Sequence, residues 1–264
     1  MPRGAAGFIR IRVSMMSSSN DSELNNKGFT LIELIVSIAI CVLVAAAIGV
    51  LLTGSLGNFD YNQTTIGLQI ESQQYAQRIG NAIQTTGYAV YTCPATDSAG
   101  HAIPDVDNLY LYTADPTTSG SSQRVNCEVY YAEDTGATYN VGGTSGHLYT
   151  INHYTMSCLL SELSASGSAV PTWSGAGKAS AEPLAGSVAS VHYKLYDSNG
   201  NYFSSGAKTG DTVPMGSGSV TMSEPNKVTV EIQFLSKNRT LKLDDATFYF
   251  RNGNVEFVNK FPTG

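Results

Sequence analysis

The residues with the clearest chemical potential in this chain are a carboxylate and the glycine–phenylalanine step in front of it. Glu33 lies four residues after Phe29, at the beginning of a long apolar run. An ionised side chain at the centre of a membrane helix costs about 2.5–3.5 kcal/mol, and less near an end, where it can reach the interface. This explains how Glu33 is tolerated but not why it follows the Gly28-Phe29 step so closely.

Other candidate chemistry is weak. The four histidines are scattered, and although His147 and His153 share parity on one expected strand, structural histidines are far more common than metal ligands. The stretch Asp197–Asn201 has oxygen donors that suggest calcium, but it lacks the spaced ligands of an EF-hand loop and predicts a hairpin turn. The sequence contains no nucleophile elbow, P-loop or zinc-protease motif. We expect no enzyme, no metal site and no cofactor.

The element that must position Glu33 is an apolar helix. From Leu34 to Leu52 the chain has nineteen residues without charge or proline, interrupted only by Ser37. As a helix this run is roughly 28 Å long, enough to cross a hydrocarbon core. Arg3, Arg10 and Lys27 lie before it, so the positive-inside rule predicts a cytoplasmic N-terminus and a C-terminal body outside the membrane.

A secretory signal peptide is the alternative interpretation of the same segment. Basic residues, an apolar stretch and the small residues Ala45–Ala47 would suit signal peptidase cleavage after Ala47. The protein would then be a secreted or singly anchored β-rich binding protein or adhesin. The apolar run continues to Leu52, which is longer than the roughly 7–15 residues of a signal-peptide core.

Three of the four cysteines fall in the expected extracellular part. Cys41 lies in the apolar run and is most simply a packing residue. Cys93, Cys127 and Cys158 follow it, where a disulfide can persist. Three thiols allow one bridge with one left over, and the sequence leaves the pairing open.

The segment "KGFTLIELIVSIAI" resembles the cleavage and methylation segment of type IV pilins and of the pseudopilins of type II secretion. The resemblance implies that a prepilin peptidase cleaves between Gly28 and Phe29 and that the new amine of Phe29 is N-methylated. It also implies assembly with other pilins by helix bundling on a membrane platform. Glu33 would neutralise the new amine, either in its own chain or on a neighbour. The start at Met1, Met15 or Met16 stays open.

The rest of the chain predicts an α+β fold, with the long N-terminal helix packed on an antiparallel sheet. We expect a cleaved leader at 1–28, a transmembrane and assembly helix at 29–56, an amphipathic continuation at 57–87 and a β-rich domain at 88–264. In the continuation, the residues expected to face the domain are Ile66, Ile70, Ile79 and Ile83. Alternating residues predict strands in 108–114, 124–133, 147–156, 187–196 and 227–236, a long surface loop at 161–182, and a bulge between Leu241/Leu243 and Phe248/Phe250.

A second resemblance concerns the C-terminal half. "LAGSVASVHYKLYDSNG", "KVTVEIQFLS" and "FYFRN" are similar to segments of J-type pseudopilins and PilW-like minor pilins, which implies a minor subunit, placed near the filament tip to help initiate assembly. From Phe29 onward the chain carries 11 basic and 19 acidic residues, so we expect no general nucleic-acid binding. Secretion, adhesion, motility and DNA uptake all remain open for the filament.

Overall fold

The computed structural model describes residues 29–96, 101–141, 143–161, 180–204, 206–236 and 239–258, without the side chains of 239 and 241–245. The expected leader, 1–28, and all but the ends of the expected surface loop, 161–182, lie outside this range. The chain divides into two units between Leu56 and Gly57.

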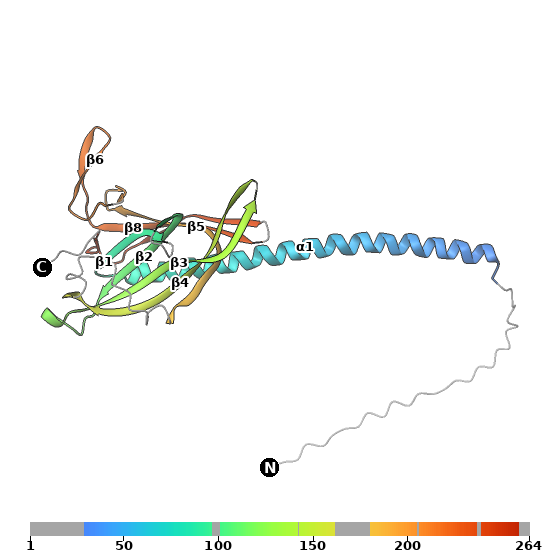
Figure 1. Cartoon of the computed structure of the whole chain (residues 1–264), viewed down its shortest axis with the longest axis horizontal. Coiled ribbons are helices and arrows are strands. Elements are labelled where there is room, and N and C mark those ends of the chain that lie inside the picture. Colours follow the sequence, from blue (N-terminus) through green and yellow to red (C-terminus); the bar gives the residue numbers. More distant parts are fainter. Residues whose placement is uncertain are drawn as a thin grey trace, which may run out of the picture. The chain divides into compact units, whose positions relative to one another are not determined.

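The helix α1 spans Leu31–Thr85, 55 residues, and belongs to both units (Figure 1). Up to Leu56 every residue of α1 is exposed. From Gly57 onward α1 gains a buried stripe, with spacings of three and four residues that place it on one face of the helix. The buried residues of this stripe are Leu68, Ser72, Tyr75, Ile79, Gly80, Ala82 and Ile83.

The expected inner face of this second half is correct only near its end. Ile79 and Ile83 are fully buried. Ile66 and Ile70 are 53% and 49% exposed, so their predicted burial is wrong. Ile79 lies nine positions after Ile70, which is about two and a half turns at 3.6 residues per turn. The two isoleucine pairs therefore lie on opposite sides of α1.

In the described part of the second unit, eight strands form the main sheet, in the order β10-β1-β2-β3-β4-β5-β8-β9. The strands β6 and β7 form a separate hairpin that projects from the rest of this unit (Figure 1). The strands are β1 (Ala89–Thr96), β2 (Ala102–Ala114), β3 (Arg124–Val141), β4 (Thr144–Leu159), β5 (Glu182–Asp197), β6 (Thr212–Met215), β7 (Gly218–Thr221), β8 (Pro225–Ser236), β9 (Arg239–Tyr249) and β10 (Glu256–Phe257).

The sheet is not the simple antiparallel sheet that the sequence predicts. A parallel bridge between Val106 of β2 and Val191 of β5 closes the run β2-β3-β4-β5 into a barrel-like ring of four strands. β1 and β10 are also parallel. Register shifts in the β3–β4 and β4–β5 pairs mark irregularities, and bulges of this kind bend strands sharply enough to let a small sheet close. The α+β class is confirmed, while the strictly antiparallel sheet is wrong.

The predicted strands are present. Side chains on the two faces of the sheet belong to two separate buried clusters. On β3, Val125, Cys127 and Val129 belong to one buried cluster, while Tyr130 belongs to the other, which also contains the buried face of α1. The expected inner face of β8 is confirmed, because all four residues are at most 1% exposed: Val228, Val230, Ile232 and Phe234. The register shift between β8 and β9 places the expected bulge opposite Val230–Ile232.

Sequence reasoning missed β1, β10 and the β6–β7 hairpin. In β1, Pro94 is unfavourable for a strand, because proline has no backbone N–H and cannot donate a hydrogen bond to a neighbouring strand. The structure accommodates it because β10 pairs only with Ala89 and Val90. Pro94 therefore lies beyond β10, on a part of β1 that pairs with β2 on its other side.

Candidate functional site

The first candidate site is the beginning of α1, where the side chain of Glu33 caps the N-terminus of the helix. The Oε2 atom of Glu33 accepts hydrogen bonds from the backbone N–H of Thr30 at 2.9 Å and from the Thr30 hydroxyl at 3.0 Å. In return, the N–H of Glu33 donates to the Thr30 hydroxyl at 3.3 Å. This is a capping box, which satisfies backbone donors that otherwise lack partners at a helix start.

The capping box was missed in the sequence, although its signal is present. Thr30 and Glu33 fit the pattern of Ser or Thr followed three residues later by Glu, directly before an apolar run. Phe29 is the first residue that the structure describes, and Gly28 lies outside the described range. Because Glu33 is bonded to the N–H of Thr30, its carboxylate lies close to the backbone of Phe29.

The hydroxyl groups in and next to the apolar run of α1 form hydrogen bonds within the helix. The hydroxyl of Ser37 donates to the carbonyl of Glu33 at 2.7 Å, and that of Thr53 donates to the carbonyl of Gly49 at 2.6 Å. A lipid-exposed helix must satisfy such groups internally. By length and composition α1 is able to cross a membrane, and no other helix in the described residues meets that test.

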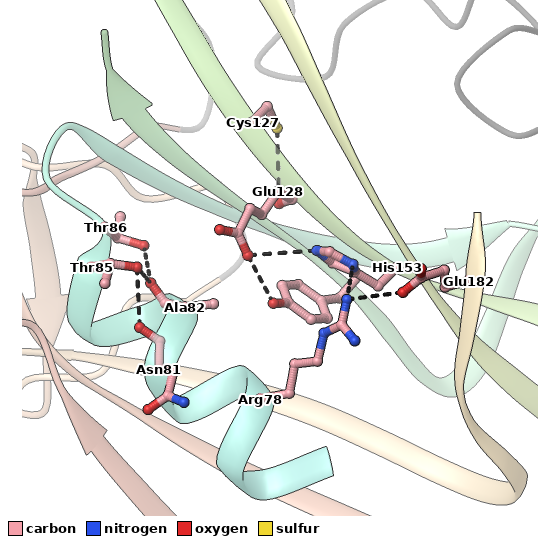
Figure 2. A network of polar contacts seen from close by, with 10 residues as sticks. Arg78, Asn81, Ala82, Thr85, Thr86, Cys127, Glu128, His153 and Glu182 are labelled. Carbon is pink, nitrogen blue, oxygen red and sulfur yellow. Dashed lines mark hydrogen bonds and ion pairs between the residues drawn. The ribbon is translucent and has the colours of Figure 1, made fainter. Parts of the chain in front are cut away.

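The second candidate site is a polar network between α1 and the sheet (Figure 2). Arg78 of α1 lies 3.2 Å from Nδ1 of His153 and donates to Glu182 at 3.1 Å. On the other side of the ring, Nε2 of His153 lies 3.5 Å from Glu128, which also accepts from the hydroxyl of Tyr130 at 3.0 Å. The interactions with His153 and Tyr130 and the positive charge of Arg78 lower the pKa of Glu128.

The network positions α1 on the sheet and does not have the arrangement of a catalytic site. Arg78 can only donate, so His153 accepts through Nδ1 and presents Nε2–H to Glu128. Tyr75 adds a second link, since its hydroxyl lies 2.5 Å from that of Tyr193 on β5. The side chains of Arg78, Glu128 and Glu182 are 38–68% exposed, but Tyr75, Tyr193 and His153 are buried. These buried polar groups favour one arrangement of α1 on the sheet, because another would leave them unpaired. The network was not foreseen, because Arg78 and its partners lie far apart in the sequence.

His147, His192 and the suspected calcium turn are engaged in contacts within the protein. His147 is bonded to Asp134, and His192 to Asp107. The Asp197 carboxylate accepts from the backbone N–H groups of residues 199, 201 and 223 and from the Asn201 amide. These donors occupy the oxygens that a cation would need, so the predicted hairpin turn is the better description. Within the described residues, no group of three or more potential metal ligands occurs.

The three cysteines of the second unit are free thiols in this structure. Cys127 and Cys158 belong to the same buried cluster, and Cys93 packs against it. The register places Cys127 opposite Met156 and Cys158 opposite Val125, so the two cysteines lie diagonally on neighbouring strands. Cys93 lies on β1, with β2 between it and β3. Burial raises the pKa of Cys127 and that of Cys93.

Comparison with known protein families identifies one segment. Residues 24–56 match the prokaryotic N-terminal methylation motif. No curated protein and no solved structure matches the chain. The matched segment includes Gly28, Phe29 and Glu33. Together with the apolar part of α1, the match supports a type IV pilin-like protein, processed at its N-terminus and anchored by a single membrane pass. A motif of this kind implies assembly with other pilins and processing by a prepilin peptidase.

Proposed function

We propose that this chain is a minor pilin or pseudopilin, a structural subunit that enters a type IV pilus-like or type II secretion filament through the first half of α1. The observation that carries this proposal is the methylation motif over residues 24–56 on a helix that is exposed and apolar from Leu34 to Leu52. An apolar surface of this length needs lipid or neighbouring helices to cover it.

In this proposal, a prepilin peptidase cleaves between Gly28 and Phe29, and the amine of Phe29 is N-methylated. Cleavage places a positive charge at the start of α1, one residue from the N–H that Glu33 already binds. In a medium of low dielectric, an unpaired charge is costly and a paired one much less so. Glu33 therefore favours entry of the helix into the filament, by neutralising this amine in its own chain or on a neighbour.

The orientation and the place in the filament belong to the same proposal. The N-terminus lies in the cytoplasm and the second unit outside the membrane, because Arg3, Arg10, Arg12 and Lys27 precede the apolar run. The similarity of the C-terminal half to J-type pseudopilins and PilW-like minor pilins supports a subunit near the tip that helps to initiate assembly. The partners are other pilins, the prepilin peptidase and the membrane assembly platform.

The test is the N-terminal sequence and intact mass of the protein recovered from cells that contain the processing enzymes. We expect an N-methylated Phe29 at the terminus. A terminus at Ile48 would show cleavage after Ala47 by signal peptidase, would remove Glu33 from the mature chain, and would refute the pilin proposal in favour of a secreted binding protein.

We also propose that any disulfide in the second unit joins Cys127 to Cys158. Neighbouring strands lie about 4.8 Å apart, so Cys93 is about 10 Å from β3, whereas bridged Cα atoms lie within about 7 Å. Peptide mapping without reduction should find Cys127 and Cys158 in one linked pair and Cys93 open to alkylation. A linkage that contains Cys93 would contradict this pairing.

A further inference from the structure

A cavity of about 150 Å³ lies within the second unit, and the assembly function does not use it. It forms where β1, β2 and β5 meet β10 and the loop that follows β5. Its volume resembles that of an engineered protein cavity that binds benzene. Five of the lining residues are aromatic, and the rest are small or polar. The aromatic ones are Tyr91, Tyr193, Tyr202, Phe203 and Phe257, and the others are Thr92, Cys93, Pro94, Asp107, Ser204 and Gly206.

The cavity has a buried floor and an accessible rim. Tyr193, Phe203 and Phe257 are at most 4% exposed and form the floor. Tyr202 is 43% exposed and lies at the rim. The hydroxyl of Tyr193 is engaged with Tyr75 of α1, and the rings of Phe203 and Phe257 pack against each other with their centroids 4.8 Å apart. A small group that enters from solvent therefore meets aromatic side chains at both the rim and the floor.

A carboxylate completes the lining. Asp107 of β2 lines the cavity, and its Oδ2 atom lies 3.1 Å from Nδ1 of His192. The electrostatic environment of His192 and Tyr202 includes the acidic groups Asp105, Asp107 and Glu231 and the basic group Lys194. Lys194 is itself bonded to Glu231 at 2.6 Å. Among the described lining residues, Asp107 is the only carboxylate and no lysine, arginine or histidine occurs, so the lining presents a negative group to an occupant.

The cavity does not have the chemistry of a cysteine nucleophile. Cys93 also lines it, but burial raises the pKa of this thiol to about 11. The thiolate is the reactive form, and at neutral pH Cys93 is a protonated thiol. Aromatic faces beside a carboxylate instead match the known use of aromatic cages, which hold organic cations by attraction to the ring faces.

We propose that this cavity binds a methylated ammonium head group, with Tyr202 and the floor rings around the cation and Asp107 as its counter-charge. A methylated ammonium fits better than a primary one, because it needs no hydrogen-bond acceptors on every side and loses less hydration on entering an aromatic cavity. Its size is also close to that of benzene. The head group belongs either to a free small molecule or to a larger phosphocholine-type compound.

The proposal can be tested by titrating the full-length protein, in a detergent without choline groups, with choline and with its uncharged carbon isostere, dimethylbutanol. Calorimetry gives the dissociation constants, and saturation-transfer NMR on the N-methyl protons locates the buried part of the ligand. We expect saturable binding of choline and at least about tenfold weaker binding of the isostere, which corresponds to about 1.4 kcal/mol. Equal binding of the two, or no saturable binding of choline, would overturn the proposal.

Two variants and a matched control connect the binding to the cavity. Tyr202→Leu and Asp107→Asn should each weaken choline binding about three- to tenfold. Tyr249→Leu replaces another exposed tyrosine, on β9 and outside the cavity lining, and should leave binding unchanged. Tyr202→Leu is the decisive variant because this side chain lies at the rim and is 43% exposed, so its replacement disturbs the fold less than replacement of a buried floor residue. Unchanged binding in Tyr202→Leu, or an equal loss in Tyr249→Leu, would place the cation elsewhere and refute the site.

A further titration identifies the source of the head group. Phosphocholine presents the same cation with a phosphate attached, and the phosphate would extend through the rim. Tighter binding of phosphocholine than of choline indicates a phosphocholine-type ligand, and equal or weaker binding indicates a free ammonium compound. Both results depend on the cation–isostere difference, and neither depends on filament assembly. Failure of this proposal is therefore distinguishable from failure of the assembly function, which N-terminal sequencing tests.

Discussion

The apolar side chains of α1 are exposed in its first half and partly buried against the sheet in its second half. From Leu31 to Leu56 every residue is exposed, including Leu31, Leu43 and Leu51, which are at least 70% exposed. From Gly57 to Thr85 the apolar residues are fewer, but Tyr75, Ile79 and Ile83 are completely buried. The first half therefore needs cover from outside its own chain, while the second half finds it in the sheet.

This difference indicates which contacts belong to folding and which to assembly. In the second half, full burial of one large apolar side chain contributes about 1.5–3 kcal/mol to stability. In the first half, the same type of residue contributes to stability only after lipid or other helices surround it. Substitutions in the first half should change assembly and leave the second unit folded, and substitutions in the second half should do the reverse.

The largest expected effect comes from Glu33. Glu33→Ala removes both the charge and the cap on Thr30, and we expect it to leave membrane insertion intact and to lower incorporation into filaments at least about tenfold, as an unpaired charge in a dry bundle costs more than about 1.4 kcal/mol. Quantitative immunoblotting of sheared filaments and of membranes gives both values.

A conservative variant separates charge from capping. Glu33→Gln keeps an oxygen that can accept from Thr30 but has no negative charge, so it should lose incorporation as Glu33→Ala does. Asp60→Asn, a neutralised carboxylate farther along α1 and beyond the apolar run, is the matched control and should assemble normally. Normal assembly of Glu33→Gln would mean that the cap, rather than the charge, is what matters.

The next effect concerns the packed half. A Cβ atom added at Gly80 would lie 2.6 Å from the ring of Phe248 on β9. Gly80→Ala should therefore lower the free energy of unfolding of the second unit by about 1–3 kcal/mol, in spite of the better helix propensity of alanine. Denaturant unfolding followed by tyrosine fluorescence measures this change. Filament defects in Gly80→Ala without a loss of stability would contradict the division between the two halves.

A glycine-to-alanine substitution at Gly67 should change the free energy of unfolding in the opposite direction. Gly67 also lies in the second half of α1, but a Cβ atom there has nothing within 4 Å. Gly67→Ala should raise the free energy of unfolding by about 0.5–1 kcal/mol, because glycine loses more conformational freedom in a helix. The two variants form a matched pair in the same unfolding experiment, and a loss of stability in Gly67→Ala would show that this face of α1 is covered.

The smallest effect is a pH dependence confined to the second unit. The hydrogen bond to Asp107 holds the pKa of His192 above its usual value of 6.5. Because the folded pKa is raised, this contribution to stability is fully present below about pH 6.5 and is lost as the pH rises through the folded value. The thermal midpoint should fall over this window in the natural protein. It should not do so in His192→Gln, and an equal fall in that variant would assign the effect to another group.

The sequence by itself determined the elements whose signals are local. The apolar run from Leu34, the methylation segment around Phe29, and the alternation of Val228, Val230 and Ile232 each lie in one continuous stretch. Helix and strand periodicity follow from backbone geometry, so these stretches predicted α1, β8 and the membrane segment without any knowledge of the rest. The Thr30–Glu33 cap was equally local and could have been found.

Only the tertiary structure decided the features that join distant residues. The face of α1 that is buried, the Val106–Val191 closure of the ring and the contacts of Arg78 with His153 and Glu182 bring together positions many tens of residues apart. The cavity does the same for Asp107, Tyr202 and Phe257. Such pairings depend on register and strand order, which small differences in packing energy select among many arrangements with the same local pattern. The chain's local periodicity therefore fixes what its elements are, and their mutual packing decides which side chains meet.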